Sequence, residues 1–214
     1  MSVLPTGLAK SLAEDYTIDQ SLRFNAGDSA YLSRTLGTAT NRKIWSFSCW
    51  FKCGDMDPSA NKIFLSGGNG DNMIRLDDLQ RLQIYAYIAP TDYGWISEPV
   101  LRDPAAWYHV LFVTDTTNAS ETLRQRIYFN GVELTARATD YGNPPEDYEG
   151  LINSAAEHQV GGGFGSQYCD GYLAEVYFID GTALTPASFV ETDEDTNQLK
   201  PIDSDTVKDA VTFG

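Results

Sequence analysis

The chain has 214 residues, of which 42% are hydrophobic, and its 15 lysine and arginine residues face 30 aspartate and glutamate residues, giving a formal net charge of −15 at pH 7. This length and apolar content are typical of one globular domain with a hydrophobic core. The charge argues against nucleic acid as a partner, because phosphate binding depends on lysine and arginine contacts that release counterions. It also disfavours an anionic membrane surface, and no stretch approaches the ~18 consecutive apolar residues of a membrane-spanning helix.

Short runs of alternating apolar and polar residues, separated by glycine, asparagine, aspartate and proline, predict an all-β protein. Residues 45–52 place Trp45, Phe47, Cys49 and Phe51 on one face, which is the expected core face. Residues 107–113 are apolar on both faces and predict a central strand covered on each side. Further strands are expected at 63–65, 73–76, 82–88, 124–129, 132–134 and 172–179, with the turn Asn130-Gly131 predicting a tight hairpin.

The three cysteines, Cys49, Cys53 and Cys169, are expected to be reduced structural thiols. Cys49 and Cys53 are four residues apart in one predicted strand, which separates them by roughly 13 Å. A disulfide requires Cα atoms within about 7 Å, so this pair cannot form one unless the strand breaks. The spacing is also not that of a zinc site.

Two terminal segments fall outside the strand pattern. We expect residues 1–20 to form an N-terminal arm, residues 21–190 the main domain, and residues 191–214, with seven acidic and two basic residues, an acidic C-terminal tail. Both termini can be interpreted as frayed ends or as elements that dock onto a partner. The first residues also lack the charged leader and apolar run of a secretory signal.

The order of the predicted strands resembles the concanavalin A-like jelly roll, in its laminin-G-like and pentraxin-like branch. This resemblance implies a β-sandwich of two antiparallel sheets. The segments that carry it span about 170 residues and are SLRFNAGDSAYLSRT (21–35), WSFSCWFK (45–52), WYHVLFVTD (107–115), RIYFNGVEL (126–134) and GYLAEVYFIDGTALTPASF (171–189).

Within that branch, three segments resemble virion proteins of tailed bacteriophages, notably of marine and cyanobacterial phages. They are YTIDQSLRFNAGDSAYLSRT (16–35), NRKIWSFSCWFKCG (41–54) and LAEVYFIDGTALTPASFVETDEDT (173–196). Such proteins are described as tail-fibre or capsid-decorating proteins. The resemblance implies a homo-oligomer on the virion exterior, in contact with other virion proteins through its N-terminal arm. Related sequences continue past a Thr-Phe-Gly like that of residues 212–214, which suggests a longer parent protein.

No catalytic residues are predicted, although the superfamily includes glucanases. Glycoside hydrolysis needs two carboxylates facing each other across a cleft. The one close string, Glu191–Asp195, lies in the polar tail, and Glu175 stands alone. His109 and His158 have no serine in a nucleophile-elbow context, so a nucleophilic triad is not indicated either.

No metal or other cofactor is predicted. The acidic loops Asp55–Asp57, Gly70–Asn72 and Asp77-Asp78 could offer oxygen ligands to calcium, but none matches an EF-hand. Laminin-G-like domains often carry Ile-Asp-Glu-Val in the closing strand, whereas this chain reads Leu173-Ala174-Glu175-Val176. Solvated loops are therefore the simpler interpretation.

Two segments combine aromatic and polar side chains in predicted loops, Thr91–Trp95 and Asp140–Tyr148. Exposed aromatic rings beside hydrogen-bonding groups are typical of glycan sites and equally of protein–protein contacts. Three alternatives remain: an assembly contact, binding of a host surface glycan, or ordinary loop packing. The candidate binding residues are Asp92, Tyr93, Trp95, Tyr141 and Tyr148.

Overall fold

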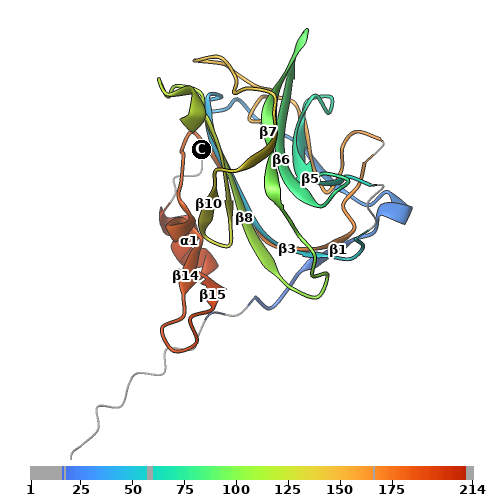
Figure 1. Ribbon diagram of the computed structural model, residues 1–214, viewed down its shortest axis with the longest axis vertical. Coiled ribbons are helices and arrows are strands. Elements are labelled where there is room, and N and C mark those ends of the chain that lie inside the picture. Colours follow the sequence, from blue (N-terminus) through green and yellow to red (C-terminus); the bar gives the residue numbers. More distant parts are fainter. Residues whose placement is uncertain (1–15, 17, 57–59, 166, 211–214) are drawn as a thin grey trace, which may run out of the picture.

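The computed structural model describes residues 16, 18–56, 60–165 and 167–210. They form a sandwich of two antiparallel sheets, which confirms the predicted all-β jelly-roll architecture (Figure 1). The six-stranded sheet contains, in spatial order, β1 (Leu22–Phe24), β13 (Gly171–Asp180), β3 (Ile44–Cys53), β8 (Tyr108–Asp115), β9 (Gln125–Phe129) and β10 (Val132–Leu134). The seven-stranded sheet contains β11 (Arg137–Asp140), β7 (Thr91–Val100), β6 (Arg81–Ile88), β5 (Asn72–Leu76), β4 (Lys62–Gly67), β12 (Glu157–Val160) and β2 (Leu32–Thr35).

The main core lies between the sheets and follows from the alternation of each strand. Phe47, Cys49 and Phe51 of β3 point inward and are at most 2% exposed, as predicted. Phe51 packs against Phe64 of β4, with ring centroids 4.9 Å apart. Burying such a side chain stabilises the fold by ~1.5–3 kcal/mol relative to leaving it in water.

The predicted central strand and hairpin are also confirmed. β8 lies between β3 and β9 and is buried on both faces. At the turn between β9 and β10, Asn130 and Gly131 both adopt positive φ values, 47° and 79°. This is the geometry of a type I′ turn, whose twist matches that of the flanking strands.

A second apolar cluster covers the outer face of the six-stranded sheet. It is formed by the sheet and by β14 (Val190–Thr192), β15 (Leu199–Pro201) and α1 (Ser204–Ala210), which lie beside β8 and β10 (Figure 1). Trp50 and Val207, from the sheet and the helix, are 7% and 1% exposed. No helix among the described residues is long and apolar enough to span a bilayer.

The described part of the expected acidic tail, residues 191–210, carries most of β14 together with β15 and α1 and packs on the outer face of the sheet. This segment folds back because Leu199, Ile202 and Val207, spaced among the acidic residues, pack with the preceding Val190 against the outer face of the sheet and leave water there. The acidic residues occupy exposed or half-buried positions on the other side. Residues 211–214 lie outside the described residues.

The expected N-terminal arm, residues 1–20, is described only at Tyr16 and from Ile18 onward. Residues 1–15 and 17 lie outside the described residues. The Tyr16 hydroxyl donates a hydrogen bond to Glu175 Oε1 at 2.8 Å, and Ile18 packs against the outer apolar cluster. The end of the expected arm therefore rests on the sheet that the C-terminal segment also covers.

Cys49, Cys53 and Cys169 are free and buried, as predicted. Burial raises the pKa of the Cys53 thiol to about 11 and that of Cys169 to about 12. Both thiols are therefore protonated at neutral pH and behave as small apolar core residues.

Candidate functional site

Trp95 is a core residue and not an exposed ligand contact. The segment expected to be a loop forms the first half of β7, in which Trp95 pairs with the inward-facing Ile84 of β6. Trp95 is 1% exposed, and its Nε1 donates to the carbonyl oxygen of Gln125 at 3.3 Å. A buried indole cannot stack on a sugar, so its assignment as a binding residue was wrong. Strand alternation continuing from the turn at Pro90 places it in the core.

The other four candidates divide into two groups. Asp92 is exposed and Tyr141 is 40% exposed, and both lie at the outer face of the seven-stranded sheet. Tyr93 is half-buried and shares the core-facing side of β6 and β7 with its partner Ala86. Tyr148 is half-buried in a pocket at one end of the sandwich. The structure thus brings Asp92 and Tyr141 to one surface and separates Tyr93, Trp95 and Tyr148 from it.

This surface, which we call the tyrosine face, arises from alternation in β6. Leu82 and Ile84 point into the core at 0% and 1% exposure, so Gln83 and Tyr85 point outward. The antiparallel register places Arg75 of β5 beside Gln83, and Gly94 of β7 beside Tyr85. The face is defined by Arg75, Gln83, Tyr85, Asp92 and Tyr141.

Hydrogen bonds hold the polar groups of the tyrosine face in fixed positions. Arg75 Nε donates to Gln83 Oε1 and Nη1 donates to Gln167 Oε1, both at 2.7 Å. Burial lowers the pKa of Arg75, but a guanidinium remains charged at neutral pH. Its Nη2 makes no hydrogen bond to a described residue, so this nitrogen is an oriented donor open to a ligand.

Tyr85 is also held in place. Its hydroxyl donates to Asp92 Oδ1 at 2.7 Å. Partial burial, followed by this hydrogen bond and the charge of Asp92, raises the pKa of Tyr85 to about 12. The phenol is therefore neutral at physiological pH, and its ring is kept in one orientation by a charge-assisted hydrogen bond.

Gly94 places a residue without a side chain between the half-buried ring of Tyr85 and the exposed ring of Tyr141. It pairs with Tyr85 across β6 and β7, and it exchanges backbone hydrogen bonds with Tyr141 and Gly142 on its other side. Its φ is +116°, and a Cβ here would collide with the carbonyl oxygen of Ile84. Glycine is thus required by the backbone, and the consequence is a side-chain-free position flanked by Tyr85 and Tyr141.

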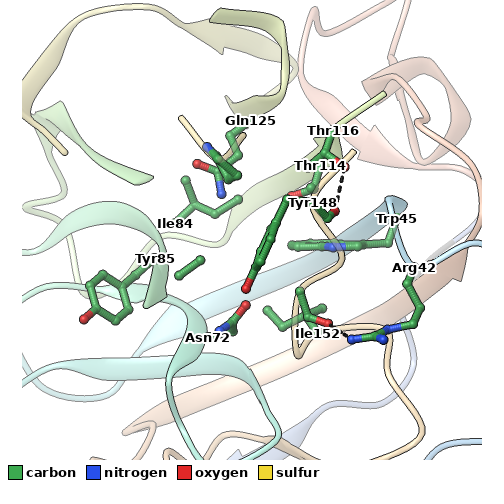
Figure 2. Close-up of a pocket in the computed structure, with 13 residues that line it drawn as sticks. Arg42, Trp45, Asn72, Ile84, Tyr85, Thr114, Thr116, Gln125, Tyr148 and Ile152 are labelled. Atoms are coloured by element: carbon green, nitrogen blue, oxygen red, sulfur yellow. Dashed lines mark hydrogen bonds between the residues drawn. The ribbon is translucent and has the colours of Figure 1, made fainter. Parts of the chain in front are cut away.

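Tyr148 belongs to a different feature, the end pocket (Figure 2). Its ring lies among the lining residues with its hydroxyl toward Asn72, whereas Tyr85 points away from the pocket. Three polar atoms that line it, Asn72 Nδ2, Thr114 Oγ1 and Gln125 Oε1, are buried without a hydrogen-bond partner among the described residues. The cavity volume is about 20 Å³, which fits one water molecule or one hydroxyl group but no sugar ring.

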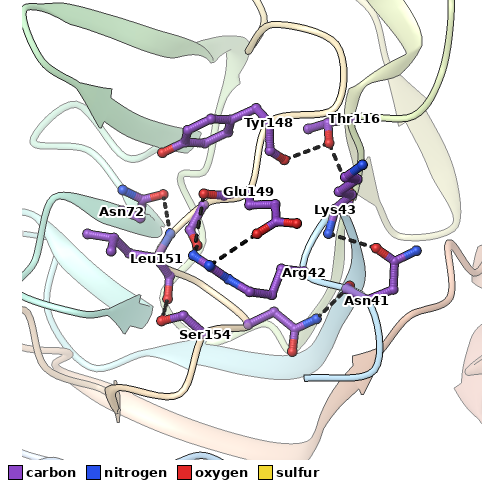
Figure 3. Close-up of polar contacts among 11 residues, drawn as sticks. Asn41, Arg42, Lys43, Asn72, Thr116, Tyr148, Glu149, Leu151 and Ser154 are labelled. Carbon is purple, nitrogen blue, oxygen red and sulfur yellow. Dashed lines mark hydrogen bonds and ion pairs between the residues drawn. The ribbon is translucent and has the colours of Figure 1, made fainter. Parts of the chain in front are cut away.

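The loop that carries Tyr148 is fastened to the start of β3 (Figure 3). Arg42 Nη2 donates to the Gly150 carbonyl at 2.6 Å, and Thr116 Oγ1 donates to the Tyr148 carbonyl at 2.7 Å. The ion pair of Arg42 with Glu149 at 3.2 Å is solvent-exposed and contributes little by itself. These contacts give Tyr148 a structural role in closing the end of the sandwich.

Metal ligation finds no support in the described part of the chain, where no three histidine, cysteine or acidic side chains gather around a possible ion position. Of the acidic loops, Asp77 is engaged by Arg81, whose backbone and side-chain nitrogens both donate to its carboxylate. Asp57 lies outside the described residues.

Sequence reasoning missed Tyr85, Arg75 and Gln83. The signal was present, because a strand over residues 82–88 with Leu82 and Ile84 inward necessarily turns Gln83 and Tyr85 outward. The proximity of Arg75 to Gln83 was not accessible, since it depends on the register between β5 and β6.

Comparisons with known proteins agree with this fold. A family model described as the concanavalin A-like lectin/glucanases superfamily matches residues 24–188. A heptameric SAP-like pentraxin from Limulus polyphemus is 15% identical, with a TM-score of 0.51 over 77% of each chain. Domain 4 of AbnA, an extracellular arabinanase from Geobacillus stearothermophilus, is 17% identical, with a TM-score of 0.50 over 74% of this chain and 78% of that one.

A protein from Bacteroides ovatus described as carbohydrate binding is 16% identical, with a TM-score of 0.56 over 80% of this chain and 46% of that one. No curated protein matches the chain in sequence. At these identities the solved structures establish a shared fold, and function has to be argued from the surface of this chain.

Proposed function

The chain belongs to the concanavalin A-like lectin/glucanases superfamily, and from this premise we propose that it is a non-catalytic glycan-binding domain whose contact surface is the tyrosine face. One observation carries the proposal: the exposed ring of Tyr141 and the half-buried ring of Tyr85 lie on either side of Gly94, which has no side chain, beside polar groups fixed by hydrogen bonds. Rings can stack on the apolar face of a sugar, while Arg75 Nη2 and the Asp92 carboxylate bond its hydroxyls.

The fold relatives support a glycan as the ligand class. Domain 4 of AbnA was solved in complex with arabinotriose, and the Bacteroides ovatus protein is described as carbohydrate binding. Because the fold alone does not determine a ligand, the proposal rests on the tyrosine face and uses these relatives as support.

We expect Tyr141→Ala to weaken glycan binding roughly 2-fold to 10-fold, since a lost stacking contact is worth about 0.5–1.5 kcal/mol. Stability should change by less than about 0.5 kcal/mol, because the ring is a surface side chain. The measurement is calorimetric titration with a polysaccharide identified on a glycan array. Trp107→Ala is the matched control, because this aromatic residue is 38% exposed, precedes β8 of the other sheet and packs on Tyr172 of β13. Equal binding by Tyr141→Ala and the parent would reject the tyrosine face.

Release of reducing ends from the bound polysaccharide would instead indicate a glycan hydrolase.

We further propose that this domain is displayed on the exterior of a tailed-phage virion, as a tail-fibre or capsid-decorating protein that contacts other virion subunits. The support is the resemblance of residues 16–35, 41–54 and 173–196 to such proteins. In that setting the tyrosine face would attach the particle to host surface polysaccharide.

Immunogold electron microscopy of the phage particle with an antibody to this domain tests the setting. Label on distal tail fibres is the result expected for host attachment, and label over the head would indicate decoration of the capsid. Particles without label would contradict the virion proposal while leaving glycan binding to be tested separately.

A further inference from the structure

The guanidinium of Arg75 on the tyrosine face forms no ion pair with a described residue. Its side chain is half-buried, and its hydrogen bonds go to the neutral amide oxygens of Gln83 and Gln167. By contrast, four other arginines each pair with a carboxylate at 2.5–3.3 Å: Arg42, Arg81, Arg124 and Arg137. A half-buried charge without a counter-ion is costly, so this position favours an anion from outside the chain.

Gln83 places a second donor beside this charge. Its side chain is 2% exposed, and its Oε1 accepts the hydrogen bond from Arg75 Nε at 2.7 Å. The other amide atom, Nε2, makes no hydrogen bond with a described residue. Because buried amide groups are normally hydrogen-bonded, a ligand oxygen at this position would satisfy Gln83 as well as Arg75.

Aromatic rings lie next to the two donors. Tyr85 follows Gln83 by two residues on the outward side of β6, so the two side chains are neighbours along the strand. Burial lowers the pKa of Arg75, and the charges of Asp77, Tyr85 and Tyr141 act in the opposite direction. Both phenols of the tyrosine face are thus near the guanidinium, and a sugar stacked on either ring has its edge beside the donors.

The acidic residues of this region leave the position at Arg75 open to a ligand anion. Asp77 is bound by Arg81, with 2.5 Å between Oδ2 and Nη2, so its charge is compensated within the chain. Asp92 lies in register with the position four residues along β6 from Gln83, a backbone separation of roughly 13 Å. A carboxylate at Arg75 is therefore kept apart from the charge of Asp92.

We propose that the glycan bound at the tyrosine face is acidic, with a uronic acid carboxylate that accepts hydrogen bonds from Arg75 Nη2 and Gln83 Nε2. This inference rests on the proposed glycan-binding function and adds the class of sugar, so that the acceptor at Arg75 is a carboxylate oxygen rather than a hydroxyl. A carboxylate has two oxygens, and the adjacent side chains offer one open donor for each. A sulfate ester has three terminal oxygens, of which one would lack a donor from this pair.

Calorimetric titration of the full chain tests the class of sugar. It compares polygalacturonate, alginate and hyaluronan with the carboxyl-reduced form of each polymer, and dextran sulfate with dextran. We expect at least one uronate polymer to bind about 10-fold to 100-fold more tightly than its reduced form, because hydrogen bonds between charged groups are the stronger ones. Dextran sulfate should bind no more tightly than dextran.

Three results of this titration would overturn the inference: equal affinities within every uronate pair, no binding of any uronate polymer, or a preference for dextran sulfate that equals the preference for uronates. If the reduced polymers bind as tightly as the acidic ones and Tyr141→Ala weakens both, glycan binding by the tyrosine face stands and only the acidic class is rejected.

Gln83→Glu tests the two donors with little change in the shape of the side chain. The introduced carboxylate would pair with Arg75, neutralise the guanidinium and remove the Nε2 donor. We expect this variant to lose the 10-fold to 100-fold preference for uronate polymers and to keep the affinity of the parent for the reduced forms. A variant that keeps the preference would contradict the assigned contacts.

Arg34→Gln is the matched control, because it lowers the net charge of the chain by one, as Gln83→Glu does. Arg34 is exposed in β2, at the far edge of the same sheet, and should be dispensable for the preference. An equal loss in both variants would show that overall charge, and not the position at Arg75, sets the preference.

Urea unfolding shows whether Gln83→Glu folds as the parent does. If it is less stable, Arg75→Lys provides the test, since lysine keeps the charge and loses the planar fork of donors. We expect Arg75→Lys to retain only part of the preference for uronate polymers. A preference equal to that of the parent would overturn the proposed contact.

Discussion

Trp95→Ala is expected to lower the free energy of unfolding by about 3–5 kcal/mol, the range for removal of a large aromatic side chain from a packed core. Trp95 is among the largest fully buried side chains of the chain. The variant loses the packing of the indole, its hydrogen bond to the Gln125 carbonyl, and its contact with the Arg137 guanidinium, which lies 4.8 Å from the ring centroid. Such a loss is a large share of the 5–15 kcal/mol that stabilises a typical domain.

Urea unfolding of Trp95→Ala beside Tyr141→Ala measures this difference. Tyr141→Ala should unfold near the midpoint of the parent, because its ring is 40% exposed. Trp95→Phe should fall between the two, since it keeps part of the apolar volume and loses the indole donor. A fully stable Trp95→Ala variant would show that residue 95 is not a core position and would restore it as a candidate ligand contact.

Acidification from pH 7 to pH 4 is expected to destabilise the parent by about 3 kcal/mol more than it destabilises His109→Gln. His109 is fully buried, and its Nε2 lies 2.8 Å from Ser48 Oγ under the rings of Trp50 and Phe189. Burial lowers its pKa from 6.5 to about 4. Nδ1 has no hydrogen-bond partner among the described residues, so a second proton would be left unsatisfied.

The direction follows from the two pKa values of His109. Well above pH 6.5 the imidazole is neutral in both the folded and the unfolded chain, so it contributes no pH dependence. Between pH 6.5 and about 4 the unfolded chain binds a proton that the folded chain does not, and stability falls as the pH falls. Below pH 4 this contribution levels off.

Thermal or urea unfolding at several pH values measures the effect as a difference between the two proteins. The carboxylates and His158, whose pKa is also lowered by burial, titrate in both proteins. Their contributions to stability therefore cancel in the difference between the parent and His109→Gln. His158→Gln is the control that should retain the His109 contribution. Parallel stability curves for the parent and His109→Gln would contradict the assigned burial of this histidine.

Local sequence pattern was sufficient for features that depend on neighbours along the chain. The alternation of residues 45–52 determined which side chains of β3 enter the core, and the pair Asn130-Gly131 determined the hairpin, because only residues that tolerate positive φ fit a type I′ turn. The apolar character of residues 107–113 on both faces correctly indicated a strand covered on each side.

At the candidate site, local sequence pattern was not sufficient to predict which side chains are buried. Thr91–Trp95 contains polar residues and glycine, so it resembled a loop, but pairing with β6 made it a strand and alternation then buried Trp95. Likewise, the acidic residues of 191–210 concealed apolar positions such as Val207, whose burial depends on sheet strands from much earlier in the chain, from β3 to β13.

The sequence by itself thus determined the all-β class, the strand faces and the turns, because periodicity and turn chemistry are local properties of the chain. The concanavalin A-like family followed from the resemblance of its segments to that family, which the match over residues 24–188 shows. The tertiary structure decided which aromatic rings stay in water, that Arg75 stands beside Gln83 and Tyr85 beside Gly94, and that the C-terminal segment covers the outer sheet face. Those features are set by strand register and by long-range burial, which depend on residues far apart in the sequence.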